Sequence, residues 1–106
     1  WPDENLAWMS DYLKRDKDAR SFWQFRNSVG FILCGARNML LKRGMYHKRY
    51  GEILDAFSAL HPERGAIVKE AHDYRKDWAD WQQKTIDVPR FYRDALDFLE
   101  WCRATD

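Results

Sequence analysis

The sequence predicts an all-α fold, namely a compact antiparallel bundle of four to five helices. Apolar residues recur three and four positions apart through most of the chain, which is the repeat of an amphipathic helix. The 106 residues contain three prolines and five glycines, which are the residues that disfavour helix interiors, so the segments between them are long enough to form helices. Connections between the segments are short, and short connections favour antiparallel neighbours. This length fits one core, and residues 1–106 are therefore expected to form a single helical domain.

The composition favours a folded chain without a membrane span. Hydrophobic residues make up 45% and aromatic residues 16% of the sequence, more than a disordered chain carries. The longest low-charge run, residues 27–41, is interrupted by Arg37 and is shorter than the ~20 apolar residues that cross a bilayer. The chain starts at Trp1 with neither an initiator methionine nor a signal peptide, so we expect a processed start or a fragment of a longer protein. Cys34 and Cys102 stand at apolar positions, which predicts free thiols in a reducing cytoplasm.

The first predicted helix runs from Pro2 to about Arg15. Proline followed by the acidic pair Asp3 and Glu4 is a favourable helix start. The helix has one apolar stripe at helical spacing, made of Leu6, Met9 and Leu13 with Trp8 and Tyr12 beside it.

The second predicted helix has the most regular apolar repeat in the chain, in which spacings of three and four residues alternate. The members of this repeat are Phe22, Phe25, Val29, Ile32, Ala36 and Met39. Asp16 and Asp18 precede it and can accept the free backbone N–H groups of its first turn. Gly44 follows Lys42 and Arg43 and is placed to cap the C-terminal end.

Three further helices are predicted. A stripe that continues from Met45 indicates a third helix, which Pro62 ends near His61 because proline lacks an N–H and clashes with the preceding turn. A fourth helix follows Pro62 and a fifth follows Pro89. The three stripes are, in order, Tyr46, Tyr50, Ile53, Phe57 and Leu60; Ile67, Ala71, Tyr74, Trp78 and Trp81; and Phe91, Ala95, Phe98 and Cys102.

Charge is distributed unevenly, although the formal net charge is only +1. No acidic residue lies between Asp18 and Glu52, while the same stretch holds seven basic residues. These are Arg20, Arg26, Arg37, Lys42, Arg43, Lys48 and Arg49. A local field of one sign favours an anionic partner. The hypothesis requires that folding gathers these side chains on one surface.

Two kinds of partner suit such a surface. Between Lys42 and Tyr50 the cations are mixed with aromatic rings, which could hold phosphates by charge and stack a base. Tyr46 and Tyr50 also belong to the third apolar stripe, which would turn their rings inward. A protein partner with an acidic surface is the first hypothesis and nucleic acid is the second. Nucleic-acid-binding domains usually carry a strong positive net charge, whereas the net charge of this chain is near neutral. The predicted partner-binding residues are Arg37, Lys42, Arg43, His47, Lys48, Arg49, Trp23 and Trp101.

Trp23 and Trp101 are the predicted aromatic anchors for a protein partner. Six tryptophans are more than a small core encloses easily, and interfaces are enriched in this residue. Both stand beside the main apolar stripe of their helix. The alternative is that wide apolar helix faces simply bury them.

Small residues on the second helix predict a close helix contact. Gly30, Cys34 and Asn38 lie four residues apart, with Gly35 beside them. Glycine inside a helix costs about 1 kcal/mol relative to alanine, so a compensating close approach of another backbone is expected. The approaching backbone belongs either to a neighbouring helix of the same chain, which we favour, or to a second copy in a homodimer.

One pattern of residues in the sequence suggests a catalytic function. His47, the adjacent His72 and Asp73, and then Asp87 or Asp94 follow an order that resembles the metal-dependent phosphohydrolases of the HD type, which are all-α. That likeness implies a phosphohydrolase as the third hypothesis. It is confined to residue order, so the sequence predicts no metal, no cofactor and no catalytic residue. We therefore expect a non-catalytic module in an inhibitor, immunity, adaptor or regulatory role.

Overall fold

The all-α prediction is confirmed by a computed structural model, which describes residues 2–15, 22–77 and 86–105. These residues contain five α-helices, one 3₁₀ turn and no β-strand. The elements are α1 (Pro2–Arg15), α2 (Phe22–Leu41), α3 (Tyr50–Leu60), η1 (Pro62–Arg64), α4 (Gly65–Lys76) and α5 (Val88–Ala104). The predicted first, second and fifth helices are therefore present close to their expected bounds, while the fourth ends earlier than its stripe predicts, at Lys76 with Asp77 as the C-cap. The proposed caps Asp16 and Asp18, and Trp78 and Trp81 of the fourth stripe, lie outside the described residues.

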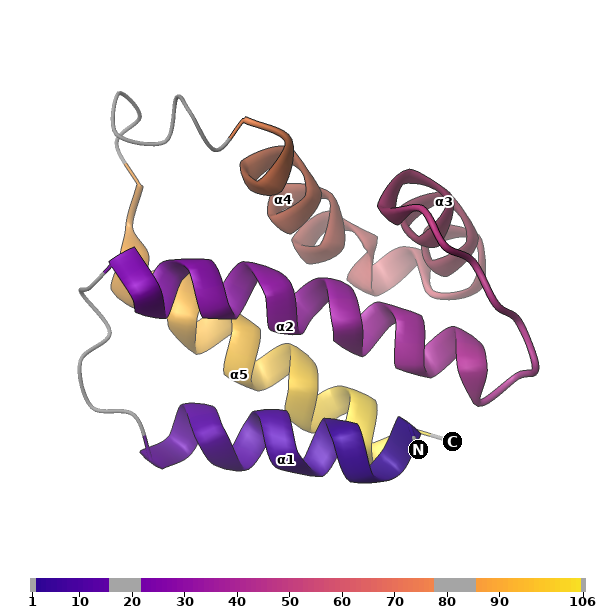
Figure 1. The fold of residues 1–106 in the computed structure, drawn as a ribbon, viewed down its shortest axis with the longest axis horizontal. Helices are drawn as coiled ribbons and strands as arrows, with labels where there is room; N and C mark the ends of the chain where they lie inside the picture. Colours follow the sequence, from indigo (N-terminus) through magenta and orange to yellow (C-terminus); the bar gives the residue numbers. More distant parts are fainter. Residues whose placement is uncertain (1, 16–21, 78–85, 106) are drawn as a thin grey trace.

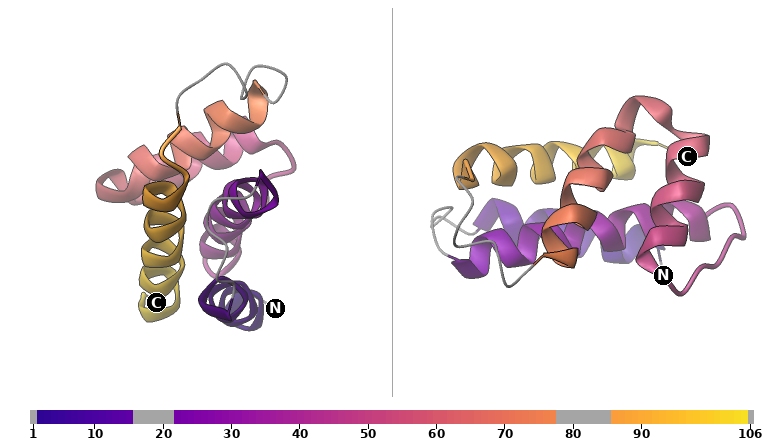
Figure 2. Two further views of the ribbon diagram at one scale, coloured as in Figure 1. Left: turned by 90° about the vertical axis from the view of Figure 1, so that its left-hand side faces the viewer. Right: turned by 90° about the horizontal axis from the view of Figure 1, so that it is seen from above.

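Helix α2 is the centre of the bundle. It contacts each of the other α-helices, with α1 and α5 beside it (Figure 1). Helix α1 runs antiparallel to α2, and α5 runs in the same direction as α2. Helices α3 and α4 form a hairpin that lies across this layer, as the two views of Figure 2 show. The long apolar α2 is thus covered on most of its circumference.

One apolar core holds the elements together, and the predicted stripes of α1, α2 and α5 supply most of it, whereas Leu60 of the third stripe is exposed and Ile67 of the fourth is only partly buried. The α2 stripe from Phe25 to Met39 is buried, as are the α1 stripe and the α5 stripe. Gly35 allows α2 and α5 to approach closely, because a Cβ at this position would lie 3.0 Å from Leu99 Cδ2 and 3.1 Å from Phe98 Cε2. The preferred explanation of the small residues, packing within the chain, is therefore correct for Gly35. A Cβ at Gly30 would meet nothing within 4 Å, so no such packing explains Gly30.

The third helix starts later than predicted. Gly44 caps α2 as expected, in the left-handed conformation with φ of +75°. The Gly44 N–H donates to the Leu41 carbonyl and the Met45 N–H to the Leu40 carbonyl, each at 3.0 Å. This double hydrogen bond turns the chain away from α2, so residues 45–49 form a loop and α3 begins at Tyr50. The predicted inward position of the Tyr46 ring is wrong, since this residue is 66% exposed.

The α3–α4 hairpin sets the position of the site described below. Pro62 begins the short turn η1, and α4 follows directly at Gly65. A Cβ at Gly65 would lie 2.8 Å from Ser58 Oγ, so glycine permits the two helices to pack closely at this end. At the other end, Gly51 of α3 lies next to His72 of α4. The N-terminal end of α3 is therefore beside the C-terminal end of α4.

Candidate anion-binding site

A pocket of about 420 Å³ lies where the start of α3 meets the end of α4. The loop before α3, the first turn of α3 and the last turns of α4 contribute its walls. Its lining residues are Lys48, Arg49, Tyr50, Gly51, His72, Arg75 and Lys76. Four of these residues carry a positive charge and none carries a negative charge. We call this group of seven residues the basic pocket.

The Tyr50 ring positions one of the four cations. The guanidinium carbon of Arg75 lies 4.3 Å from the centre of the ring, and that of Arg37, from α2, lies 5.1 Å from it. Each such contact is worth about 0.5–1 kcal/mol at a partly exposed site. The ring therefore restricts the orientation of Arg75 before any ligand arrives. It also links α2 to α4 through α3.

The four cations of the basic pocket are available to a ligand. Within the described residues, no ion pair involves Lys48, Arg49, Arg75 or Lys76, although the acidic side chains of the same helices do form such contacts. Asp73 accepts a hydrogen bond from Lys69 Nζ at 2.8 Å. Glu52 Oε2 lies 3.8 Å from His47 Nδ1. Glu52 thus lies against the loop before α3 and Asp73 pairs with Lys69 of its own helix, although Asp73 Oδ1 also lies 4.0 Å from Nδ1 of His72, which lines the pocket.

The first turn of α3 adds backbone donors to the basic pocket. Arg49 is the N-cap residue, in the extended conformation, and its side chain makes no capping hydrogen bond. The first intrahelical donor is the Ile53 N–H, which donates to the Arg49 carbonyl at 3.0 Å. The amide N–H groups before it have no helical partner, and the helix dipole makes this end partly positive. Gly51 leaves space in front of them, since a Cβ there would meet only His72 Nε2, at 4.0 Å.

The described residues of the basic run do not all line the basic pocket, so only part of the run can act together there. Only Lys48 and Arg49 of the run line the basic pocket, and Arg37 supports it from behind through the Tyr50 ring. Arg43 is exposed at the end of α2 but does not line the pocket. His47 is half-buried beside Glu52. Arg20 lies outside the described residues.

Lys42 has a structural position instead of an interfacial one. Its ammonium group donates to the carbonyls of Thr105 at 3.1 Å and Cys102 at 3.4 Å, at the C-terminal end of α5. It also lies 2.8 Å from Asp3 Oδ1 of α1. A cation at the negative end of a helix is favourable, and the Cys102 carbonyl accepts from both Lys42 and the Thr105 N–H, the latter at 3.4 Å. Lys42 therefore joins α1, α2 and α5.

The two predicted tryptophan anchors are not brought to the basic pocket by any described contact. Trp101 is half-buried and packs against Phe57, Phe98 and His61, with the Arg64 guanidinium 5.0 Å from its ring centre. These contacts lie at the C-terminal end of α3, about 16 Å along the helix from the pocket at a rise of ~1.5 Å per residue. The side chain of Trp23 lies outside the described part of the structure.

Sequence reasoning missed Arg75, Lys76 and His72 as members of the site. They belong to the second half of the chain, in which acidic residues outnumber basic ones. The sequence signal was incomplete, because Arg75 and Lys76 lie inside the predicted fourth helix, whose stripe continues to Trp81, whereas α4 ends at Lys76. In an antiparallel hairpin this end lies beside the start of the third helix, where Lys48 and Arg49 are found.

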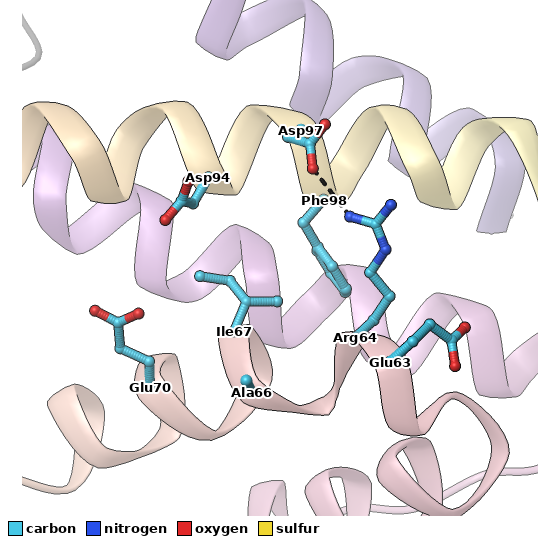
Figure 3. Close-up of a pocket in the computed structure, with 8 residues that line it drawn as sticks. All are labelled: Glu63, Arg64, Ala66, Ile67, Glu70, Asp94, Asp97 and Phe98. Carbon is cyan, nitrogen blue, oxygen red and sulfur yellow. Dashed lines mark hydrogen bonds and ion pairs between the residues drawn. The ribbon is translucent and has the colours of Figure 1, made fainter.

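A second pocket, of about 290 Å³, lies between η1, α4 and α5 and is rich in acidic residues (Figure 3). It is lined by Glu63, Arg64, Ala66, Ile67, Glu70, Asp94, Asp97 and Phe98, which we call the acidic pocket. Arg64 Nη1 donates to Asp97 Oδ2 at 2.9 Å, across the mouth of the pocket. Arg90 donates to Glu70 at 2.7 and 3.0 Å and to Asp94 at 2.8 Å. The acidic groups are thus largely neutralised by the protein itself.

Proton affinities in the acidic pocket follow from this network. Burial opposes ionisation of Glu70, but hydrogen bonds from Arg90 and Tyr74 outweigh it, so the Glu70 pKa lies below its usual value. Burial, together with the hydrogen bond to Glu70, raises the pKa of Tyr74 to about 12. Hydrogen bonds to Glu70 and Asp94 raise the pKa of Arg90. The network therefore consists of fixed charges at neutral pH.

The residues that resemble an HD-type metal site do not come together. His47 lies beside Glu52, His72 beside Asp73, and Asp94 is bound by Arg90. Within the described residues, no group of three or more His, Cys, Asp or Glu side chains is arranged to hold a metal ion. The order of these residues in the sequence is thus not matched by proximity in the fold.

A third, largely apolar pocket of about 340 Å³ lies between α1 and α2. It is lined by Asn5, Trp8, Met9, Phe31, Cys34, Arg37, Asn38 and Leu41. Trp8 is 56% exposed and forms an aromatic cluster with Tyr12 and Phe31. Asn38 is buried and accepts a hydrogen bond from Asn5 Nδ2 at 3.5 Å. Of the residues proposed for a homodimer, Asn38 thus packs within the chain, while Gly30 and Cys34 remain partly accessible.

Both cysteines are free thiols. Burial raises the pKa of Cys102 to about 12, although Lys42 and Arg64 act in the opposite direction. Burial also raises the pKa of Cys34, against the influence of Arg37. Both side chains are therefore protonated at neutral pH and are not activated as thiolates.

Comparisons with protein-family models, with curated proteins and with solved structures give no match for this chain. Among the described helices, none has the length and apolar character required to cross a membrane.

Proposed function

We propose that the chain is a non-catalytic interaction module that binds an acidic surface of a protein partner at the basic pocket. The observation that carries the proposal is the convergence of Lys48, Arg49, Arg75 and Lys76 on one concave surface, without an ion pair to any of them within the described residues. Unpaired charges of one sign raise the association rate with a complementary partner and select its orientation. An inhibitor, immunity, adaptor or regulatory role in the cytoplasm fits this proposal.

An exposed aromatic residue next to the basic pocket supplies contact area for such a partner. Tyr46 is 66% exposed and lies two residues before Lys48 in the loop that leads to α3. Tyrosine is enriched at interfaces because it combines a large apolar ring with a hydroxyl donor. In this proposal the aromatic anchor is Tyr46 and not Trp101, because Trp101 is packed at the opposite end of α3.

Nucleic acid is the second candidate partner, favoured by the exposed Tyr46 ring beside two cations. A sequence-independent single-strand site uses several stacking rings along a basic groove. Here the ring of Tyr50 already carries the guanidinium groups of Arg37 and Arg75, so Tyr46 is the remaining ring close to the basic pocket. A compact pocket with one exposed tyrosine ring in the loop beside it is a better match for one acidic cluster than for an extended phosphate backbone.

A competition between two probes of equal charge tests the proposal. A short polyglutamate peptide and a single-stranded oligonucleotide are titrated separately at the same ionic strength, with fluorescence anisotropy as the readout. We expect the peptide to bind more tightly, and Lys48→Glu with Arg49→Glu to weaken it about tenfold or more. Arg43→Glu is the matched control, because Arg43 is exposed outside the pocket, and it should have little effect.

Two results would contradict the proposal. Tighter binding of the oligonucleotide, with an affinity that falls as salt rises with a slope of about −0.7 per phosphate, would favour nucleic acid instead. An equal loss of peptide binding in the Arg43→Glu control would show that net charge, and not the basic pocket, determines binding.

A further inference from the structure

We propose that the basic pocket is a binding site for a phosphate monoester carried by a phosphorylated side chain of the acidic protein partner. This inference rests on the proposed function, because it identifies the group of the partner that enters the pocket. It depends on three observations: the number of convergent donors, the prior orientation of Arg75, and the open first turn of α3.

The number of donors exceeds what a carboxylate uses. Lys48, Arg49, Arg75 and Lys76 line one pocket of about 420 Å³ together with the ring of His72. A carboxylate carries one negative charge and is satisfied by a single guanidinium group in a bidentate pair. A phosphate monoester carries a charge of about −1.5 to −2 at neutral pH and has three terminal acceptor oxygens. The group that matches several convergent cations is therefore the monoester.

A phosphodiester is a poorer match for the same pocket. It carries only one negative charge, and two of its four oxygens are esterified, so it accepts fewer hydrogen bonds. Diesters also occur as repeated groups along a nucleic-acid strand, which favours an extended basic groove. Four of the described cations instead line one compact pocket at the junction of α3 and α4, while Lys42 and Arg90 are engaged in internal contacts.

Arg75 is held for this purpose before a ligand binds. Its guanidinium group packs on the Tyr50 ring at 4.3 Å, and Arg37 packs on the same ring at 5.1 Å. The planar guanidinium offers a fork of N–H donors that matches two phosphate oxygens, which an ammonium group cannot do. Because the ring contact already restricts the side chain, less conformational entropy is lost on binding.

The first turn of α3 completes the site with neutral donors. Arg49 gives no side-chain cap to this turn, and Gly51 presents its backbone without a side chain in the wall of the pocket. Free N–H groups at a helix start favour an anion, here in addition to the four cations. Gly51 and His72 Nε2 face each other, because a Cβ at Gly51 would lie 4.0 Å from that nitrogen. A phosphate in the pocket beside these two residues would contact both helices.

Three blocked small molecules test the inference on the intact chain. They are N-acetyl-phosphoserine methylamide, N-acetyl-aspartate methylamide and dimethyl phosphate, each titrated at pH 7.5 and constant ionic strength with amide chemical shifts as the readout. We expect saturable shifts of the Gly51 and Glu52 amides with the phosphoserine probe, at a concentration about fivefold or more below that needed for either of the other two probes.

Two variants test whether the phosphoserine probe binds in the basic pocket. Arg75→Lys retains the charge and removes the fork, and it should weaken phosphoserine binding several-fold. Arg43→Ala removes an exposed cation outside the pocket and should leave the affinity unchanged. Equal shifts from the aspartate or the diester probe, or an equal loss in Arg43→Ala, would overturn the inference.

Failure of this inference is distinguishable from failure of the proposed function. If polyglutamate binds through Lys48 and Arg49 but phosphoserine has no advantage over aspartate, the acidic-partner proposal stands and the phosphate site does not. If phosphoserine binds at Gly51 while Lys48→Glu with Arg49→Glu leaves polyglutamate binding unchanged, the phosphate site stands and the acidic-partner proposal fails.

Discussion

The basic pocket and the acidic pocket both use residues of α4, yet they differ in how their charges are satisfied. Arg64 and Arg90 engage three of the four carboxylates of the acidic pocket, at distances of 2.7 to 3.0 Å. The cations of the basic pocket form no ion pair within the described residues. Charge that is paired inside the molecule contributes to the fold, whereas unpaired charge in a concavity is available to a ligand. The comparison therefore separates a structural cluster from a candidate site.

The largest stability effect that this comparison predicts is that of Arg90→Ala. The substitution removes the donors to Glu70 and Asp94, which are about one-quarter and one-half exposed. We expect the free energy of unfolding to fall by about 1–2 kcal/mol, because hydrogen bonds between charged groups are strong but partial exposure screens them. Urea denaturation followed by circular dichroism measures this change.

The control for Arg90 comes from the basic pocket. Lys48→Ala removes the same charge from an unpaired position and should change the free energy of unfolding by less than about 0.5 kcal/mol. A similar loss in Arg90→Ala and Lys48→Ala would remove the distinction between the two pockets, since pairing would then have no effect on stability.

The helices could be predicted from the sequence because each has its own apolar repeat, which depends only on neighbours along the chain. The stripe from Phe25 to Met39 is buried as expected, and Gly44 ends α2 for the reason that its position indicates. The start of α3 was misplaced because the apolar spacing continues through residues 45–49. The hydrogen bond from Met45 N–H to Leu40 overrides that spacing.

The candidate site was predicted only in part, because it depends on which helix ends meet. Lys48 and Arg49 were identified from the absence of acidic neighbours in the sequence. Lys42 has the same sequence context, but the fold brings it to the carbonyls of Cys102 and Thr105, 60 and 63 residues away along the chain. Arg75 has acidic residues nearby in the sequence, yet the hairpin places it in the basic pocket. Net charge along a segment does not reveal such pairings.

Substitution of a paired cation of the basic run should therefore lower the free energy of unfolding, as is expected for Arg90. Lys42→Met keeps most of the apolar stem and removes the donor to Thr105 and Cys102. We expect a loss of about 1 kcal/mol in the free energy of unfolding, below the ~1.5–3 kcal/mol of a strong hydrogen bond from a charged group because both distances are long. Arg43→Met at the adjacent exposed position is the control and should be near neutral. If the two variants lose equal stability, Lys42 does not stabilise the C-terminal end of α5 as the contacts indicate.

The smallest predicted effect is the dependence of stability on acidic pH, which should arise in the acidic pocket and not in the basic one. The Glu70 pKa is lower in the folded chain than in the unfolded chain, where it is about 4.3. Its ionised form therefore stabilises the fold above the unfolded-state pKa, and this contribution is lost as the pH falls through the folded-state pKa. Partial exposure limits the contribution to less than about 1 kcal/mol. In urea titrations at pH values from neutral downward, Glu70→Gln should show less loss of stability on acidification than the unmodified chain, while Lys48→Ala should follow the unmodified chain. An unchanged acid dependence in Glu70→Gln would mean that the bonds from Arg90 and Tyr74 do not set the proton affinity of this carboxyl.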